Sequence, residues 1–473
     1  MSAQKCFLSL LAVLLLVPLA FAQPAGRILV ADPVELNAAL KTSKPGDVIT
    51  LKNGRWVDAK ITVIRGGEPG KPIELRAETP GEVILGGSSS LIIAAPYVTV
   101  TGLLFKDGKL TPKENVIWLK SHHGIVRDTA ILDYNPARFE TKYHWVDFAG
   151  SSNLVDRCLF QGKNHMGPLV QNDEFNCRHN ALTGCWFKDI PLKAKANGRE
   201  SVKISGAGHV DAASPDGAYF TLEGNLFEHA DGEGVEVISI KSNHNQILRN
   251  TLIASAGCLN IRRGSYNVVS ANVILGRGMA RAQGIRMSGE HNLVSGNFVS
   301  GCEYGIAVSS GEYWEKALTP GYVVNDRDGS AANKAHYPQN RYVTISRNLL
   351  ANNSGPDLDI GVMEYKKHWP ENQNVLLPEE CRIENNLCVR PKGGDSVIGM
   401  TPDTRPPLDR FTFQPNSYAD NLLYGGKNRC ASAATGFVEQ AIPADWSEAK
   451  ALAGFQPLTP ADVGPNWVRT KGR

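Results

Sequence analysis

The sequence has no Asp-Asp pair, no Cys-x-x-Cys pair and no strong excess of charge of either sign. Glycoside hydrolysis uses paired carboxylates, so the lack of clustered aspartates weakens the case for a glycosidase. The missing Cys-x-x-Cys pair disfavours a zinc site. A formal net charge of +3 over 473 residues argues against bulk nucleic-acid binding, which calls for a strongly basic domain. It leaves room for a local basic groove that binds an acidic polymer.

Long apolar runs are also scarce. The only long one extends from Phe7 to Phe21, after Lys5, and ends in Ala20-Phe21-Ala22. This pattern predicts a secretory signal peptide over residues 1–22, so we expect a secreted or periplasmic protein. A membrane anchor is the weaker alternative, because the run is short for a bilayer and a small-residue cleavage site follows it. No other segment is apolar enough to cross a membrane.

A three-residue, mainly apolar motif recurs along the chain at steps of 22 to 40 residues, and it often begins with Asn or Cys. We call this motif the repeated phrase. Its copies lie at 103–105, 130–132, 158–160, 185–187, 225–227, 250–252, 272–274 and 297–299, with weaker echoes at Asn348, Asn386 and Asn421. A period in the twenties, rich in Val, Ile, Asn and Gly, is typical of a parallel β-helix. No Ser/Pro/Gly-rich linker interrupts residues 23–473, so we predict one all-β solenoid domain there. No feature predicts an oligomeric state.

Eight cysteines remain after the predicted signal peptide. Cys158 and Cys185 occupy the same phase of successive repeats, and Cys388 lies close to it. We favour buried thiols that fill the coil interior over a disulfide framework, because a solenoid of this length has a large core.

Both ends of the solenoid are expected to be covered. Residues 34–42 read as a short amphipathic helix that caps the first coil, and an irregular C-terminal cap is expected from about residue 430. Residues 311–341 break the period and carry Tyr313, Trp314 and His336. Insertions in solenoids often emerge on the binding face, so these three are candidate substrate contacts. A surface loop with its own small apolar cluster is the alternative.

Four cations recur near one phase of the repeats: Lys203, Lys241, Arg262 and Arg286. Each is flanked by β-branched or apolar residues, so we expect them on strands, in a basic ladder on one face. A solvated polar face is the alternative. Glu200, Glu233 and Glu236 lie nearby in the sequence, and Glu200 is a further candidate substrate contact.

Such a row suits an acidic polysaccharide, and one reaction in particular. In a polyuronate the C5 proton lies beside a carboxylate, and its removal expels the O4-linked sugar. That β-elimination needs a base at C5, a cation at the carboxylate and a proton donor at O4. A lysine serves as the base only if it loses its proton, and neighbouring cations favour that loss.

Several motifs in order resemble the chondroitinase B-like lyases, polysaccharide lyase family six, which includes many alginate lyases. They include Lys44-Pro45-Gly46-Asp47, Asp133-Tyr134-Asn135-Pro136, Gly162-Lys163-Asn164, Asn197-Gly198-Arg199-Glu200, Glu236-Val237-Ile238-Ser239-Ile240-Lys241-Ser242 and Ile261-Arg262-Arg263-Gly264. The resemblance implies a right-handed parallel β-helix that cleaves acidic polysaccharide by β-elimination. It further implies that Lys241 is the base, that Arg262 is the proton donor or charge stabiliser, and that Arg286 contacts substrate.

Many members of that family bind calcium through an asparagine and two glutamates. Asn197 and Glu236 match two of these positions, but Gly234 stands at the third. Glu233 is one residue away and is expected to point to the other side of a strand. Calcium prefers six to eight oxygen ligands, so we expect activity without calcium, with Lys203 supplying positive charge instead.

We therefore expect a secreted alginate lyase. The alternatives are a lyase of dermatan or chondroitin sulfate and a non-catalytic carbohydrate-binding β-helix. The non-catalytic alternative is disfavoured because Lys241 and Arg262 fill both of the family's catalytic positions.

Overall fold

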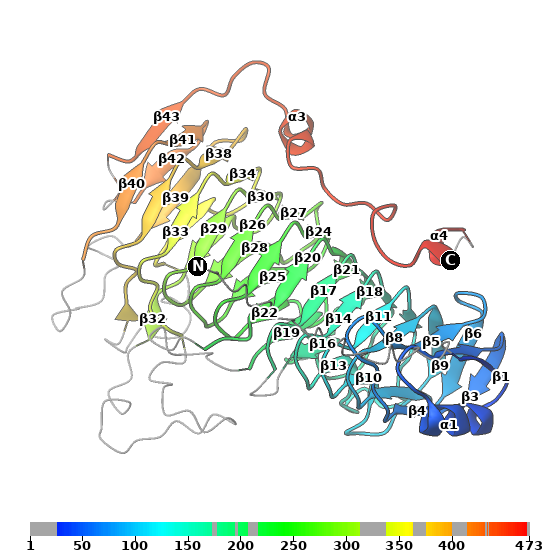
Figure 1. Cartoon of the computed structure of the whole chain (residues 1–473). Coiled ribbons are helices and arrows are strands. Elements are labelled where there is room, and N and C mark those ends of the chain that lie inside the picture. Colours follow the sequence, from blue (N-terminus) through cyan, green and yellow to red (C-terminus); the bar gives the residue numbers. More distant parts are fainter. Residues whose placement is uncertain are drawn as a thin grey trace, which may run out of the picture.

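The computed structural model describes residues 26–172, 177–193, 197–206, 216–312, 337–362, 375–399, 414–430, 433 and 435–470. The predicted signal peptide and Tyr313, Trp314 and His336 lie outside these residues. Within them the chain winds into a parallel β-helix whose coils stack three long sheets along one axis (Figure 1). The all-β solenoid expected from the repeats is confirmed. No helix in the described part of the chain is long and apolar enough to span a membrane.

Sheet A has 14 parallel strands. They are β1 (Arg27–Val30), β2 (Val48–Leu51), β5 (Ile73–Ala77), β8 (Val98–Thr101), β11 (Ile125–Arg127), β14 (Leu154–Asp156), β17 (Ala181–Thr183), β20 (Thr221–Glu223), β23 (Gln246–Leu248), β26 (Val268–Ser270), β29 (Leu293–Ser295), β33 (Thr344–Ser346), β37 (Arg382–Glu384) and β40 (Ser417–Ala419).

Sheet B also has 14 strands. They are β3 (Gly54–Val57), β6 (Val83–Gly87), β9 (Leu103–Gly108), β12 (Ala130–Leu132), β15 (Leu159–Gln161), β18 (Trp186–Ile190), β21 (Leu226–Ala230), β24 (Thr251–Ile253), β27 (Val273–Leu275), β30 (Phe298–Ser300), β34 (Leu349–Ala351), β38 (Leu387–Val389), β41 (Asn421–Tyr424) and β43 (Phe437–Gln440). Every copy of the repeated phrase falls in this sheet.

Sheet C has 13 strands, and its outer face carries the predicted cations. The strands are β4 (Lys60–Val63), β7 (Ser90–Ile93), β10 (Asn115–Leu119), β13 (His144–Phe148), β16 (Val170–Asn172), β19 (Val202–Ile204), β22 (Glu236–Ile240), β25 (Gly257–Ile261), β28 (Ala282–Met287), β31 (Ile306–Val308), β35 (Leu358–Ile360), β39 (Asp395–Gly399) and β42 (Lys427–Arg429). A small antiparallel pair, β32 (Gly311–Glu312) with β36 (Val375–Leu376), lies outside the three sheets.

An asparagine ladder holds successive coils in register. The amide of Asn225 donates to Asn250 Oδ1 at 2.9 Å, Asn250 donates to Asn272 at 3.0 Å, and Asn272 donates to Asn297 at 3.0 Å. The ladder continues through Asn348 and Asn386 to Asn421. Each side chain also satisfies a buried backbone group, which a tight turn would otherwise leave unpaired.

Cysteines take the ladder position in two earlier coils. The backbone N–H of Cys185 donates to Asn225 Oδ1 at 2.8 Å, and that of Cys158 donates to Cys185 Sγ at 3.4 Å. All eight cysteines in the described residues are free thiols and buried, so the expectation of thiols rather than disulfides is confirmed.

Helix α1 (Pro33–Thr42) covers the open end of the first coil. Its N-cap residue Asp32 accepts hydrogen bonds from the backbone N–H groups of Val34 and Glu35. Leu36, Ala39 and Leu40 are buried in the main core. The predicted capping helix is confirmed within one residue.

The C-terminal segment takes a different path from an end cap. After β43, it runs back along the outer face of sheet B through α3 (Glu448–Ala453) to α4 (Asn466–Thr470), beside the first coils (Figure 1). We call residues 447–470 the strap. Phe455 packs near Phe298, and Trp467 joins a cluster with Leu104 and Trp186. The strap buries an apolar row that repeats along sheet B, which is why it lies there.

Candidate active site

Residues on the outer face of sheet C align across neighbouring strands. Lys203 pairs in register with Ser239, Ser239 with Asn260, and Asn260 with Arg286. Lys241 and Arg262 directly follow the paired residues Ile240 and Ile261. The four cations therefore share one face, as expected. They form two rows rather than the single ladder predicted, because Lys241 and Arg262 lie two positions further along their strands than Lys203 and Arg286.

Lys241 is held by a buried carboxylate. Its Nζ donates to Glu200 Oε1 at 3.2 Å, and the two side chains are 18% and 4% exposed. The ion-pair partner of the predicted base is thus an anion, whereas neighbouring cations were expected beside it. Glu200, expected to contact substrate, instead supports Lys241 from below.

Arg262 and Arg286 converge on Glu236. Arg262 Nη1 lies 3.3 Å and Arg286 Nη2 lies 3.4 Å from Glu236 Oε1, and Asn260 Nδ2 donates to the same oxygen at 2.6 Å. Burial raises the pKa of Glu236, but Lys241, Arg262 and Arg286 outweigh it and leave that pKa below its usual value. An ionised Glu236 therefore fixes two guanidinium groups beside Lys241.

The end of the long insertion reaches this cluster. The guanidinium carbon of Arg262 lies 5.0 Å from the centre of the Tyr337 ring. This cation–π contact adds to the grip on Arg262. Arg263, the adjacent residue, donates its backbone N–H to the Ile240 carbonyl at 3.2 Å.

Glu233 lies close to the other glutamates, so the expectation that it points away is wrong. It is in the turn before β22, between Gly232 and Gly234, which both have positive φ. Its Oε2 accepts hydrogen bonds from the backbone N–H groups of Gly198 at 2.6 Å and Arg199 at 3.3 Å. Burial, with Glu200 and Glu236 nearby, raises the pKa of Glu233 to about 7.

The residues matched to calcium ligands do not suit that ion here. A Cβ on Gly234 would lie 2.4 Å from Leu192 Cδ1, and its φ of +69° strains any other residue. Glu236 Oε1 already receives three donors, two of them guanidinium groups that would repel a metal. Asn197 is exposed. Among the residues described, no group of three His, Cys, Asp or Glu side chains is arranged to hold a metal ion.

Two buried cations support the site from beneath, and the sequence reading did not assign them a role. Lys163 Nζ donates to the carbonyls of His165 and Gly167, each at 2.7 Å. The Arg199 guanidinium donates to four backbone carbonyls, including Gly232 at 2.6 Å and His165 at 3.1 Å. These bonds tie the turn that carries Glu200 to the turn that carries Glu233. The sequence feature that could have indicated this role is the polar motif Gly162-Lys163-Asn164, whose lysine is fully buried rather than solvated.

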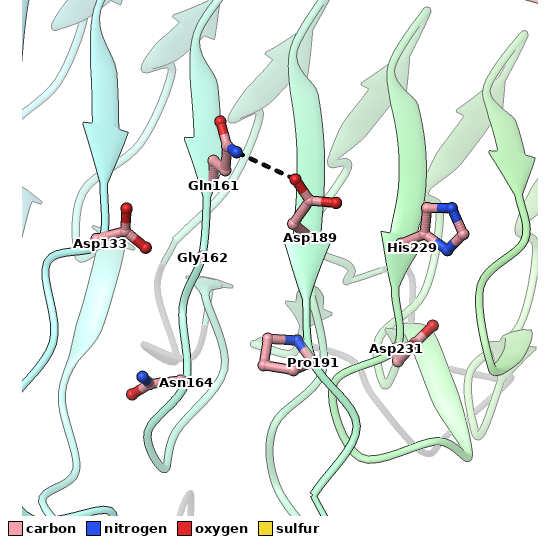
Figure 2. Close-up of a pocket in the computed structure, with 8 residues that line it drawn as sticks. All are labelled: Asp133, Gln161, Gly162, Asn164, Asp189, Pro191, His229 and Asp231. Carbon is pink, nitrogen blue, oxygen red and sulfur yellow. Dashed lines mark hydrogen bonds between the residues drawn. The ribbon is translucent and has the colours of Figure 1, made fainter.

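A separate hollow of about 450 Å³ lies at the ends of β12, β15, β18 and β21 in sheet B (Figure 2). Asp133, Asp189 and Asp231 line it together with His229, and Gln161 donates to Asp189 Oδ2 at 3.0 Å. Burial raises the pKa of Asp133, helped by Asp107 and Asp189. This is the clustering of aspartates that the sequence lacks in linear form, and it is separate from the cations of sheet C.

The comparisons agree with this geometry. The family model described as chondroitinase B matches residues 30–416. A polysaccharide lyase of family PL6 from Pseudopedobacter saltans has a solved structure that is 36% identical, with a TM-score of 0.80, over 93% of this chain and 99% of that one. The PL6 alginate lyase AlyGC is 26% identical with a TM-score of 0.75, over 93% of this chain and 59% of that one.

A mannuronic acid specific family six lyase from human gut microbiota shares the fold at 22% identity, with a TM-score of 0.76, over 94% of this chain and 97% of that one. A search of curated proteins finds no match. With the family model covering most of the chain and a 36% identical relative covering nearly all of it, the chain belongs to polysaccharide lyase family six, the family of chondroitinase B.

Proposed function

We propose that this protein is a secreted or periplasmic alginate lyase that cleaves its polymer by β-elimination. The observation that carries the proposal is the side-by-side placement of Lys241 and Arg262 at the ends of β22 and β25, with Arg286 on the next strand. Alginate is favoured because AlyGC, which is 26% identical over 93% of this chain, is an alginate lyase. The predicted signal peptide supports the location.

Each side chain has a distinct role in the proposed reaction. The neutral amine of Lys241 takes the C5 proton of the uronate. Arg286 and Lys203, one strand to either side of the β22–β25 pair, neutralise the uronate carboxylate while charge builds on it. Arg262 donates a hydrogen bond to O4, so that the C4–O4 bond breaks as the C4–C5 double bond forms.

Neutralisation by the protein's own cations needs no calcium, and we extend the proposal to say that none is used. The support is the three donors on Glu236 Oε1 and the crowding at Gly234. Activity after dialysis against EDTA should equal activity with added calcium, whereas Lys203→Ala should lower turnover. Activity that falls on chelation and returns with calcium alone would refute this part and make Glu233 the leading ligand.

A panel of polymers tests the substrate. Alginate, dermatan sulfate and pectate are incubated with the protein, and the unsaturated product is followed by ultraviolet absorbance. Absorbance that rises with alginate supports the proposal. A response to dermatan sulfate alone supports the second candidate, which the chondroitinase B family model favours. Binding to any of the three polymers without absorbance change would indicate a carbohydrate-binding β-helix without catalysis.

A further inference from the structure

Glu200 has a feature that its ion pair with Lys241 leaves unexplained. One oxygen, Oε1, accepts from Lys241 Nζ at 3.2 Å. The other, Oε2, is buried and has no hydrogen-bond partner among the described residues. An unpaired buried carboxylate oxygen costs about 1–3 kcal/mol or more, so such an oxygen in a candidate site calls for an explanation.

The proposed chemistry supplies one. A lysine takes the C5 proton only as a neutral amine, but Lys241 Nζ lies 3.2 Å from the Glu200 carboxylate, and a neighbouring carboxylate favours the ammonium form. Its proton must go somewhere before the reaction begins. We infer that Glu200 is the acceptor of that proton: when substrate covers the pair and excludes water, the proton passes from Lys241 to Glu200. This inference rests on the proposed lyase function and extends it.

The transfer balances within the pair. The Nζ–H bond of Lys241 breaks, an O–H bond forms on Glu200, and two opposite charges become a neutral amine and a neutral carboxylic acid. Lys241 then takes the C5 proton, and the electrons of the C5–H bond form the C4–C5 double bond. O4 leaves with the electron pair of the C4–O4 bond, hydrogen-bonded to Arg262, and takes a proton from water. After product release Glu200 loses its proton to solvent, which restores the ion pair. Burial drives the first step, because low polarity penalises separated charges more than neutral partners.

The charges around Glu200 are of both signs. Lys241 and the fully buried Lys163 face it as cations, with Arg199 next to it in the chain. Glu233 faces it as a carboxylate, and Glu236 lies beyond. Glu233 and Glu200 repel each other when both are ionised, so a proton is readily shared in this group. Substrate bound to Arg262 and Arg286 adds another carboxylate and increases that tendency.

The test is the pH dependence of kcat in Glu200→Gln. In the wild-type enzyme the ion pair and the neutral pair contain the same number of protons, so kcat should be flat from neutral to mildly alkaline pH. Glutamine still accepts a hydrogen bond from Lys241 but takes no proton. Its kcat at pH 7 should fall about 10²–10³-fold. It should then rise about tenfold per pH unit, as more of the lysine loses its proton to solvent.

Two further variants separate proton transfer from positioning. Glu200→Asp restores a carboxylate and should restore the flat profile, at a lower rate. Glu223→Gln makes the same chemical change in an exposed ion pair with Arg249 on sheet A and should leave the profile unchanged. A Glu200→Gln enzyme that keeps a flat profile, at any rate, would overturn the inference and leave Glu200 as a positioning residue.

Failure of the lyase proposal gives a different result from failure of the inference about Glu200. If wild-type protein produces no unsaturated product from any polymer of the panel, the lyase proposal itself has failed. If the wild type is active and Glu200→Gln matches it at pH 7, only the role of Glu200 is wrong. Circular dichroism of each variant confirms that the β-helix is intact before the rates are compared.

Discussion

The outer faces of sheets B and C belong to the same coils but carry different side chains. The aligned outer row of sheet B is almost entirely apolar and includes Leu104, Leu159, Trp186, Leu226 and Phe298, all buried. The corresponding row of sheet C reads Asp147, Gln171, Lys203, Ser239, Asn260 and Arg286. One face is covered by the strap, and the other presents ions and amides.

The difference shows how a solenoid separates stability from chemistry. The interior side chains and the asparagine ladder hold every coil in register, so neither outer face is needed to define the fold. Sheet B uses its free face to bury more apolar area beneath the strap. Sheet C uses its free face to hold Lys241, Arg262 and Arg286 at fixed spacing. We therefore expect substitutions on sheet C to change catalysis and substitutions under the strap to change stability.

The largest effect should come from Lys241→Ala. Loss of a general base costs roughly 10²- to 10⁴-fold in rate, and turnover of alginate should fall by that factor. Thermal unfolding is followed in parallel, because the variant leaves the buried Glu200 carboxylate without its cation and is expected to lower the melting temperature as well. The measurement pairs initial rates with a melting curve. A variant that keeps more than a few per cent of wild-type activity contradicts the assignment.

Arg262→Ala should follow, with kcat lowered roughly 10²- to 10³-fold, as for loss of one donor to a developing anion. Arg263→Ala serves as the matched control and should be milder, because Arg262 is the residue seen in contact with Glu236 and Tyr337. Both rates are compared at saturating polymer. The reverse ranking would show that Arg263 lines the groove.

Trp467→Ala should reverse the pattern by lowering stability without lowering kcat. Trp467, a residue of the strap, is 8% exposed and packs on the apolar cluster of sheet B, and its Nε1 donates to the Asp128 carbonyl at 2.7 Å. The expected loss is roughly 3 kcal/mol, seen as a lower urea midpoint. Lys450→Ala breaks only an exposed strap ion pair and should cost less than about 1 kcal/mol. If Trp467→Ala lowered kcat, the strap on sheet B would be shown to influence catalysis on sheet C.

The smallest effect concerns Glu233 and depends on pH. Its pKa of about 7 in the folded protein exceeds the usual value of 4.5, so its contribution to stability is present at acidic pH and lost as pH rises through 7. Glu233→Gln keeps an acceptor for the Gly198 and Arg199 N–H groups without a buried charge. It should therefore stabilise the protein by roughly 1–3 kcal/mol at pH 8 and little near pH 4.5.

Urea titrations at the two pH values measure that difference. A variant that is less stable than wild type at pH 8 would show that the ionised carboxylate is needed there. If added calcium then stabilised only the wild type, Glu233 would be a metal ligand after all.

The sequence predicted most of the solenoid because the strands of sheet B from β9 to β41 repeat the same phrase. It predicted the shared face of Lys203, Lys241, Arg262 and Arg286 because strand periodicity fixes which residues point outward. It did not predict the pairing of Glu200 with Lys241, since the two are 41 residues apart and meet only through coil stacking. It misplaced Glu233 because two flanking glycines with positive φ take that residue out of strand geometry.

The strap was missed for a related reason. Trp467 packs in a cluster with Trp186 and Leu104, which lie more than 250 residues earlier in the sequence. Nothing in the local pattern from 444 to 470 distinguishes a segment that closes the last coil from one that runs back along a sheet. The unpaired apolar row on sheet B was the available signal, because an apolar face must be covered.

Cleavage of alginate in water enriched in oxygen-18, with the products examined by mass spectrometry, tests the central claim that the cations of sheet C catalyse elimination. Elimination takes no oxygen from water, so the account predicts one new C4–C5 double bond per cut and no oxygen-18 beyond the slow exchange at reducing ends. Lys241→Ala should yield no such fragments. Saturated fragments carrying one oxygen-18 per cut would contradict it. They would show hydrolysis and direct attention to Asp133, Asp189 and Asp231 in the hollow of sheet B.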